Sequence, residues 1–445
     1  MSQGMGTNPL NEVLYAGHLR DAQAVLDAAL DALQLDGVVI AAGVEHTVFL
    51  DDQHFPFRPN PWFLWLVPPP AAPGSLLHIA PGARPRLLFV APQDYWHSPP
   101  EPPEDPWTGL FDITVVADAD AAMALAQQAG GRLAFIGEMA PPSPQWQWNP
   151  PQLLARLEQA RCIKSAYEVA CIREANHIAV AGHLAAERRF REGGAELDIL
   201  LAFLGAVRQG ENELPYPPIV ALNDHAATLH YQRRDTLVPA RSLSLLIDAG
   251  ASCRGYASDI TRTWARAPGL FANLVEAMDG VQQELCEAVA PGVDWRELHL
   301  MAHRLVARVL RDAGLLRMEP EAALESGVTA AFLPHGLGHL LGLQVHDVGG
   351  FRPAHDAEPV PRPPGHPALR LTRRLEPGMV VTVEPGLYFI GSLLDRLRSG
   401  PHAGALNWPV IERLAPCGGI RIEDDVVVTT SGHDNLTRTA FADVG

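Results

Sequence analysis

Four acidic residues interrupt stretches that otherwise have the apolar composition of buried β-strands. They are Asp248 at the end of Leu243–Ile247, Asp259 within Gly255–Thr263, Glu384 within Met379–Tyr388 and Glu423 within Gly418–Val428. An ionised carboxylate that is buried without a partner is strongly unfavourable. Any single one could cap a helix, pair with an arginine or end a strand in solvent. Four of them together predict a shared polar site inside the fold.

Three histidines occur within twelve residues, in a segment of glycines and aliphatic residues rather than charges. The segment is Leu333–Asp347, and its histidines are His335, His339 and His346. A histidine cluster on a solvated face would have charged residues between its members. Each of these imidazoles instead needs a polar or metal partner, because its surroundings are predicted to be half-buried.

Convergence of the acids would bring four negative charges together, and such a cluster stays ionised only if cations neutralise it. Two divalent ions would balance the four charges and would ionise a water between them. Four carboxylates to one imidazole favour a hard ion such as Mn²⁺ over a zinc site of nitrogen and sulfur ligands. The alternation of side chains along a strand also places Arg421 and Glu423 on one face, with Ile420 and Ile422 on the other.

Composition bounds the class of protein. The 445 residues exceed one ordinary core, and 47% hydrophobic with 19% charged residues is typical of a globular chain. The formal net charge of -17 argues against nucleic acid as the partner. Five scattered cysteines, the absence of an 18-residue apolar run and a Met1–Gly17 segment unlike a signal peptide predict a cytoplasmic protein without a membrane span.

The pattern along the chain predicts two domains, residues 1–155 and 156–445. The first contains a helix and short apolar strands typical of an α/β domain with a mixed sheet, and Pro141–Pro151 is predicted to be the linker. Its elements are predicted at residues 11–34, 37–42, 86–91, 112–117, 119–129 and 132–136. The second has helices at 165–192, 196–208, 270–289 and 295–312, and strands at 219–222, 242–248, 255–264, 379–388 and 419–429. Ser165 and Glu168 have the spacing of a helix capping box.

The set Asp248, Asp259, His339, Glu384 and Glu423 resembles the five-ligand dimetal site of the pita-bread metallopeptidases. The motifs HGLGH (335–339), VEPGLY (383–388) and GGIRIED (418–424) match in order and context. The segments Phe49–Asp52, Asp94–His97, Ala221–His225 and Asp248–Gly250 look like those of bacterial Xaa-Pro dipeptidases, the prolidases. This resemblance implies an α/β N-terminal domain with a mixed sheet, followed by an α+β pita-bread (creatinase/aminopeptidase-like) catalytic domain.

The resemblance also implies roles at the metals. Asp248 would hold one ion, Asp259 and Glu423 would bridge both, and His339 and Glu384 would complete the second. A metal-bridged hydroxide would attack the carbonyl of a dipeptide with C-terminal proline, with Glu384 as general base. Two divalent ions per subunit, Mn²⁺ by ligand hardness, are the expected cofactors.

Further residues are expected around the substrate. His346 would stabilise the oxyanion, and His230 would also act in the site. The substrate contacts are expected from Arg370, which would bind the free carboxylate bidentately, and from His346, His335 and Tyr388. Arg421 would support Glu423 and Thr261 would support Asp259 from behind.

Two other functions remain open at this point. The chain could be an aminopeptidase P that acts on longer Xaa-Pro peptides, or a non-catalytic pita-bread binding module. Hydrolysis of organophosphorus triesters is an additional expectation from the resemblance. A homodimer is also implied, and the aromatic loop Phe55–Trp65 is the candidate wall for the partner's site. The Pro- and His-rich insert at residues 351–367 departs from the family pattern and is expected to alter the pocket rim.

Overall fold

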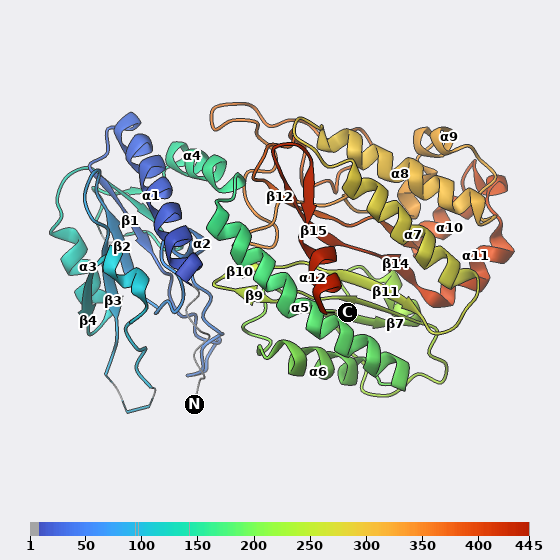
Figure 1. The fold of residues 1–445 in the computed structure, drawn as a ribbon, viewed down its shortest axis with the longest axis horizontal. Coiled ribbons are helices and arrows are strands. Elements are labelled where there is room, and N and C mark those ends of the chain that lie inside the picture. The colour runs from blue at the N-terminus through green and yellow to red at the C-terminus, as the bar shows by residue number, and fades with distance from the viewer. Residues whose placement is uncertain (1–8, 94, 97, 142, 445) are drawn as a thin grey trace. The chain divides into compact units, whose positions relative to one another are not determined.

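The computed structural model describes residues 9–93, 95–96, 98–141 and 143–444, so Asp94 and His97 of the predicted motif lie outside the described residues. The chain forms two compact units (Figure 1). The first consists of Met1–Arg161 with Ser165–Ala170, and the second of Cys162–Lys164 with Cys171–Gly445. The predicted division after residue 155 falls inside helix α4 (Pro151–Cys162).

A mixed sheet with the strand order β4-β3-β2-β1-β5-β6 forms the first unit. The strands are β1 (Gly37–Ala41), β2 (Leu76–Ile79), β3 (Arg86–Val90), β4 (Asp112–Val116), β5 (Leu133–Ile136) and β6 (Gln147–Trp148), and the helices are α1 (Pro9–Ala32), α2 (Pro61–Leu64), α3 (Ala119–Gln127) and α4, with a 3-10 turn at Pro106–Leu110. Strand β2 pairs antiparallel with β1 and β3, whereas β1–β5 and β3–β4 are parallel. The predicted mixed sheet is therefore confirmed, although β2 was not predicted.

The stretch predicted as a linker belongs to the first unit. Strand β6 pairs with β5, and Trp146 packs against Phe135 with ring centroids 5.9 Å apart. Trp146 joins the core formed by β1, β2, β3 and α3. The linker prediction was wrong because prolines and polar residues around an aromatic side chain are also compatible with an edge strand.

The aromatic loop Phe55–Trp65 also differs from its prediction. Its second half forms helix α2, which Asn60 caps by accepting a hydrogen bond from Trp62 N. Phe63 and Trp65 are buried inside the first unit, so they are not available as a wall for another subunit. Only Phe55 at the start of the loop exposes a large apolar side chain.

The second unit combines short sheets with long helices. Its strands are β7 (Ile219–Leu222), β8 (Ser244–Asp248), β9 (Ser252–Cys253), β10 (Tyr256–Ala257), β11 (Thr261–Ala265), β12 (Val380–Val383), β13 (Gly386–Tyr388), β14 (Gly419–Arg421), β15 (Asp424–Val428) and β16 (His433–Asn435). The sheets have the orders β11-β8-β7, β12-β15-β16, β13-β14 and β10-β9, and the neighbouring strands are antiparallel.

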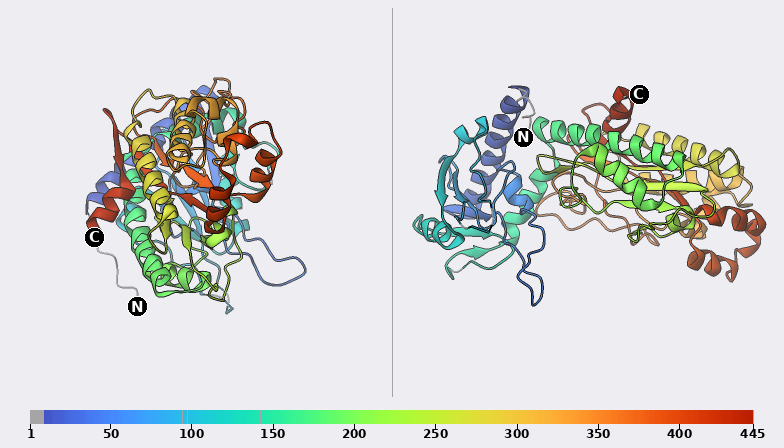
Figure 2. Two further views of the ribbon diagram at one scale, coloured as in Figure 1. Left: turned by 90° about the vertical axis from the view of Figure 1, so that its right-hand side faces the viewer. Right: turned by 90° about the horizontal axis from the view of Figure 1, so that it is seen from below.

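The first four helices of this unit match the predicted helical segments, and the last four were not predicted. The eight helices are α5 (Ala166–Glu192), α6 (Glu196–Val207), α7 (Leu270–Glu287), α8 (Trp295–Asp312), α9 (Pro320–Glu325), α10 (Gly391–Arg398), α11 (Trp408–Leu414) and α12 (Leu436–Val444), with 3-10 turns at Asn223–Ala227, Val328–Ala331, Ala403–Ala405 and Ala415–Cys417. Helices α5 and α7 run along one side of the strands (Figure 2). The predicted capping box is confirmed, since Ser165 N donates to Glu168 Oε2 at 2.8 Å and Glu168 N donates to Ser165 Oγ at 3.3 Å.

Three predicted long strands are interrupted in the structure. The segments 255–264, 379–388 and 419–429 each divide into two shorter strands. Asp259, Glu384 and Glu423 lie at these interruptions rather than inside strands. Pro385 explains one of them, because proline has no N–H to donate to a sheet. The predicted facing is confirmed, since Ile420 and Ile422 join the main core while Arg421 and Glu423 face a cavity.

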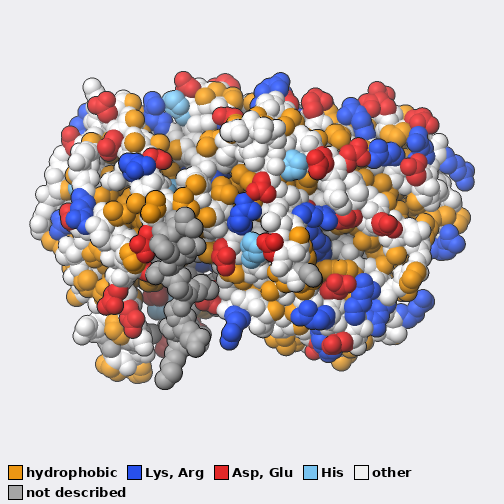
Figure 3. Space-filling view, in the orientation of Figure 1, with side chains coloured by type: hydrophobic (Ala, Val, Ile, Leu, Met, Phe, Trp, Pro, Cys, Tyr) orange, Lys and Arg blue, Asp and Glu red, His pale blue; other side chains and the backbone are white. Residues whose placement is uncertain are grey.

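Acidic and basic side chains are interspersed over the face of the second unit drawn in Figure 3. The five cysteines form no disulfide bond with one another. Among the helices that the structure describes, none has both the length and the apolar character needed to cross a membrane.

We expect Trp146→Ala to destabilise the first unit by about 3–5 kcal/mol, the range for removal of a large aromatic side chain from a core. Chemical denaturation followed by circular dichroism measures this change. Trp148→Ala is the matched control, because Trp148 is 49% exposed and should cost much less. Equal, small effects of both substitutions would contradict a core role for Trp146.

Candidate metal centre

Backbone pairing aligns two of the predicted ligands with a threonine between them. Asp248, the last residue of β8, pairs with Thr261 at the start of β11. Thr261 in turn forms an isolated bridge with Glu423. Asp248, Thr261 and Glu423 therefore lie side by side across strands that are far apart in the sequence.

A second pairing brings His339 next to Glu384. Thr382 N donates to His339 O at 3.0 Å, and Glu384 N donates to Leu337 O at 2.8 Å. Residues 337–339 thus run beside β12. Gly338 permits this approach, because a Cβ at this position would lie 2.0 Å from Thr382 O. The glycines of the HGLGH motif therefore have a packing role.

Asp259 enters the site from the gap between β10 and β11. Its N–H donates to Asp425 Oδ2 at 3.0 Å rather than to a neighbouring strand. The preceding residue, Ser258, packs against Gly250, where a Cβ would lie 1.9 Å from Ser258 O. The turn after β8 and the approach to Asp259 are consequently in close contact, which positions Asp259 beside Asp248.

All five predicted ligands line one cavity of about 270 Å³, together with His230, His335, His346, Arg370 and Arg421. His339 Nε2 lies 3.5 Å from Asp259 Oδ2 and 3.9 Å from Glu384 Oε1. Asp259, His339 and Glu423 each present a ligand atom, and these three atoms lie within 4.8 Å of one another. Asp248 and Glu384 are further lining residues of the same cavity.

The donor set fits divalent metal ions. His339 Nδ1 lies 3.0 Å from Leu340 O, so this nitrogen donates to the carbonyl and the Nε2 lone pair faces the carboxylates. Ligating histidines commonly have their other nitrogen fixed in this way. Oxygen donors dominate the cavity, which suits hard cations.

The raised pKa values of the carboxyl groups show that their ionised forms are unfavourable in the absence of cations. Burial raises the pKa of Glu384 to about 7, with nearby Asp259 and Asp248 adding to the shift. Burial and the neighbouring acids also raise the pKa values of Asp259 and Glu423. For His339, burial lowers the pKa, but the hydrogen bond and charge of Asp259 outweigh it and raise the pKa overall. A divalent ion would remove the like-charge repulsion and allow these groups to remain deprotonated.

Tyr216 joins the two aspartates. Its hydroxyl lies 2.8 Å from Asp248 Oδ1 and 2.6 Å from Asp259 Oδ1. One hydroxyl hydrogen cannot serve both oxygens, so the second contact requires a proton or a cation. Burial and the charges of Asp248 and Asp259 raise the pKa of Tyr216 well above its usual value. The side chain is therefore a neutral donor that holds the pair together.

The supporting residues have direct partners that the sequence did not predict. Arg421 Nη2 donates to Asp248 Oδ2 at 2.6 Å, and its contact with Glu423 is indirect, since Arg421 Nε donates to Thr261 Oγ1 at 3.1 Å. Thr261 Oγ1 donates to Glu423 Oε2 at 2.6 Å, rather than supporting Asp259. Tyr388 is fully buried, and its hydroxyl contacts Arg421 Nη1 and His335 Nε2 instead of the cavity. These differences arise because strand register, not spacing in the sequence, selects the partner.

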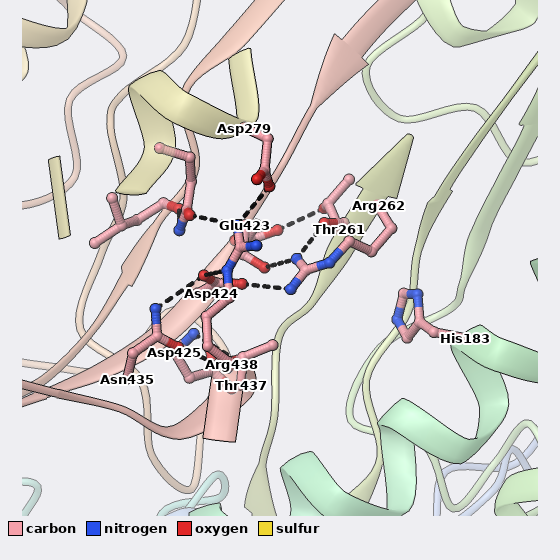
Figure 4. A network of polar contacts seen from close by, with 12 residues as sticks. His183, Thr261, Arg262, Asp279, Glu423, Asp424, Asp425, Asn435, Thr437 and Arg438 are labelled. Atoms are coloured by element: carbon pink, nitrogen blue, oxygen red, sulfur yellow. Dashed lines mark hydrogen bonds and ion pairs between the residues drawn. The ribbon is translucent and has the colours of Figure 1, made fainter. Parts of the chain in front are cut away.

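A buried polar network backs Glu423 (Figure 4). Arg262 donates to Glu423 O at 2.8 Å and to Asp424 Oδ1 at 2.7 Å. Arg438 donates to the other oxygen of Asp424 at 2.8 Å. Despite the opposing effect of burial, the two arginines lower the pKa of Asp424 to about 2. This network fixes the backbone that carries Glu423, because each charged group in it has a partner.

The remaining predicted residues lie around the cavity opening. His230 and Arg370 are exposed lining residues. His346 packs against His339 with ring centroids 4.4 Å apart, and desolvation together with the charges of His339 and Arg370 lowers its pKa to about 3. His335 is less available, because its Nδ1 lies 2.7 Å from Gly336 O and its Nε2 2.9 Å from the Tyr388 hydroxyl.

Sequence reasoning missed Tyr216, Asp424 and Asp425. The signal for the two aspartates was present, since they directly follow Glu423 at the start of an apolar strand. Tyr216 sits between prolines in Pro215–Pro218, and that pattern indicates a rigid turn but not its contacts.

Family models agree with this architecture. The model of metallopeptidase family M24 matches residues 170–430, and the model of the Xaa-Pro dipeptidase N-terminal domain matches residues 13–159. The predicted fold class, an α/β N-terminal domain followed by a pita-bread catalytic domain, is confirmed.

The similarity to known proteins covers nearly the full length of the chain. The Xaa-Pro dipeptidase of Xanthomonas campestris pv. campestris (strain B100) is 47% identical over 98% of this chain and 99% of the relative. That of Stenotrophomonas maltophilia (strain K279a) is 46% identical over 96% of this chain and 97% of the relative. Among solved structures, the low-pH form of aminopeptidase P from E. coli has a TM-score of 0.73 at 24% identity, with 95% of each chain covered. Aminopeptidase PepP of Pseudomonas aeruginosa has a TM-score of 0.71 at 22% identity, with 97% of this chain and 98% of that chain covered.

We expect the gain in unfolding temperature on adding Mn²⁺ to chelator-treated protein to increase between pH 5 and pH 8. The pKa values of Glu384, Asp259, Glu423 and His339 are raised in the fold, so protonation of these groups stabilises the metal-free fold at a pH below their ordinary pKa values. This stabilisation is lost as the pH rises through the raised pKa of each group, which for Glu384 is about 7. Ions that keep the groups deprotonated prevent this loss. An ion at 100 times its Kd adds about 2.7 kcal/mol.

Scanning calorimetry at several pH values measures the effect. Histidines that titrate equally in the metal-free and the Mn²⁺-loaded protein do not contribute to the gain in unfolding temperature. Glu423→Gln should reduce the gain at high pH. A gain that is the same at every pH would show that the ion does not compete with protons in this cluster.

Proposed function

This chain belongs to metallopeptidase family M24, and from that premise we propose that it hydrolyses dipeptides with a C-terminal proline, as an Xaa-Pro dipeptidase. The observation that carries the proposal is one small cavity that combines four carboxylates and His339 with an exposed arginine at its opening. The named relatives with this activity are 46–47% identical over almost the whole chain.

Asp248, Asp259, His339, Glu384 and Glu423 would hold two divalent ions, with Asp259 and Glu423 shared between them. Mn²⁺ is the proposed metal, because four of the five donors are carboxylates. The ions supply, when bound, Lewis-acid polarisation of the scissile carbonyl and a water that ionises near neutral pH. Two observations support this assignment. A hydrogen bond fixes His339 Nδ1, and the pKa values of Asp259, Glu384 and Glu423 are raised.

Glu384 would act as the general base that moves a proton to the proline nitrogen. It lines the cavity and lies opposite His339. His346 would donate a hydrogen bond to the carbonyl oxygen as negative charge develops. Its lowered pKa of about 3 keeps the imidazole neutral at pH 7, which suits a donor of this kind. His230 lies at the same opening and would share the task of binding the substrate.

Arg370 would read the free carboxylate of the proline residue. Its guanidinium has the planar fork that matches a carboxylate, and it lines the cavity opening. The neighbouring arginines are engaged elsewhere: Arg373 is buried and pairs with Glu376, and Arg374 donates to Gly292 O. Among the three, Arg370 is therefore the one suited to a substrate contact.

The alternative is an aminopeptidase P that accepts longer peptides, since the solved structures with the same fold are aminopeptidases P. Arg370 favours the dipeptidase, because a residue after proline would remove the carboxylate from its position. A non-catalytic module is disfavoured, because all five donors remain in one cavity.

Mn²⁺-loaded enzyme is expected to cleave Ala-Pro with a higher kcat/KM than Ala-Pro-Ala. Arg370→Met should reduce kcat/KM for Ala-Pro about 10–100-fold, since a hydrogen bond to a charged group contributes about 1.5–3 kcal/mol, and should leave Ala-Pro-Ala nearly unchanged. Arg374→Met is the control. Preference for the tripeptide in the wild type would favour the aminopeptidase. Turnover of a paraoxon-like triester in the same assay tests the organophosphorus activity, and its absence would remove that expectation.

Homodimerisation and a cytoplasmic location are further parts of the proposal. A small number of cysteines without a disulfide bond among them fits a reducing compartment. For the dimer, the turn between Thr47 and His54 is a better contact than the predicted loop, because Phe49 is 88% and Leu50 91% exposed.

We expect the double substitution Phe49→Asp with Leu50→Asp to shift sedimentation from dimer toward monomer, because charges are unfavourable in an apolar contact. Leu237→Asp, at an exposed leucine of the second unit, is the control. An unchanged dimer in the double variant would exclude this turn from the interface, and a monomeric wild type would refute the dimer itself.

A further inference from the structure

Three histidines form a cluster apart from the carboxylate-lined cavity. His299 and His303 lie one turn apart on α8, and His366 comes from the Pro- and His-rich insert. Each presents a ring nitrogen, and these three nitrogens lie within 4.8 Å of one another. The ring centroids are 4.6–4.7 Å apart in all three pairs. The Pro- and His-rich segment at residues 351–367 thus meets the buried face of a long helix.

The hydrogen bonds of the cluster leave ring nitrogens without partners. His303 Nδ1 contacts Thr329 Oγ1 at 2.9 Å, whereas its buried Nε2 has no hydrogen-bond partner within the described part of the chain. His299 Nε2 contacts His366 Nδ1 at 2.9 Å, and the buried His299 Nδ1 likewise has no partner there. His299 and His303 are each only 1% exposed. Buried polar atoms are normally satisfied, so the unpartnered His303 Nε2 beside two further imidazoles calls for a ligand.

The imidazoles are in the protonation state that a metal requires. Burial lowers the pKa of His299 to about 3 and that of His303 to about 2, and burial also lowers the pKa of His366. All three rings are therefore neutral near pH 7, and a cation that replaces the proton between His299 Nε2 and His366 Nδ1 would meet an uncharged imidazole from each residue. The Thr329 contact fixes the His303 ring in the manner of partners that orient metal ligands.

We propose that His299, His303 and His366 form a third metal site, selective for Zn²⁺ or a similar borderline ion and distinct from the carboxylate-lined centre. Three imidazoles without a carboxylate suit Zn²⁺ better than Mn²⁺. Zinc–nitrogen bonds of about 2.0–2.1 Å place tetrahedral ligand atoms roughly 3.4 Å apart, so modest side-chain rotation closes the site. His366 is partly exposed, and its side leaves room for water as the fourth ligand.

The position of this site gives the ion a structural consequence. His366 precedes Ala368 and Arg370, which both line the carboxylate cavity. Leu369 between them packs on Gly336, where a Cβ would lie 3.1 Å from Leu369 Cα. An ion on His366 would therefore anchor the segment that carries Arg370 to α8. The metal site itself does not depend on the proposed role of Arg370.

The test uses the full chain loaded with Mn²⁺, to which one equivalent of Zn²⁺ is added before gel filtration and elemental analysis. We expect one Zn²⁺ per chain to be retained in addition to the Mn²⁺. His366→Ala should weaken Zn²⁺ binding at least about 100-fold, because even loss of a residue that only orients a ligand costs about 10–100-fold. His355→Ala, from the same insert but outside the cluster, should retain the ion.

His366 is partly exposed on a loop, so its substitution leaves the helix packing intact, and His299→Gln provides a second variant. Zinc-edge X-ray absorption should show three imidazole nitrogens in the wild type. Equal zinc binding by wild type and His366→Ala would overturn the proposal. So would zinc uptake that occurs only with an equivalent release of Mn²⁺, since the ion would then occupy the carboxylate site.

Discussion

Repulsion among buried carboxylates is the constraint on which the second unit depends. Burial raises the pKa values of Asp259, Glu384 and Glu423, and the charge of Asp248 raises all three further. No packing of aliphatic side chains relieves such repulsion, so the chain must supply positive charge, protons or cations. Arg421 supplies a positive charge to Asp248. Divalent ions in the cavity would neutralise the other acids.

The surroundings of the site follow from the same constraint. Tyr216 holds Asp248 and Asp259 together through a neutral hydroxyl, while Arg262 and Arg438 neutralise Asp424 directly behind Glu423. Among the described residues, Asp259, Glu384 and Glu423 face the cavity without an ion pair to an arginine, whereas Asp424, which faces away, is paired with both Arg262 and Arg438. This division explains why the pKa of Asp424 is lowered to about 2 although it adjoins Glu423, whose pKa is raised. Two adjacent residues therefore differ in role: Asp424 is a paired structural acid, and Glu423 is a candidate metal ligand.

The unit also contains two donor sets of opposite chemistry. Oxygen atoms dominate the cavity around His339, whereas His299, His303 and His366 offer nitrogen alone. Hard and borderline cations would distribute between them by ligand type rather than by overall affinity. Residues 366–370 connect the two sets, because this short segment carries both His366 and Arg370.

Local features of the sequence were sufficient for much of the fold and for the four candidate carboxylates, whereas the choice of His339 among three histidines rested on the family resemblance. Helix α8 was predicted at its observed bounds, because its apolar residues recur at helical spacing and Asp294 caps its start. The acids in apolar runs and the HGLGH segment marked the candidate centre, since residue type and spacing are visible in the chain itself. Only the tertiary structure decided the partners: Arg421 contacts Asp248 across 173 residues, and His366 meets His299 across 67 residues. Such pairings depend on the register between distant strands and loops, which no short-range pattern encodes.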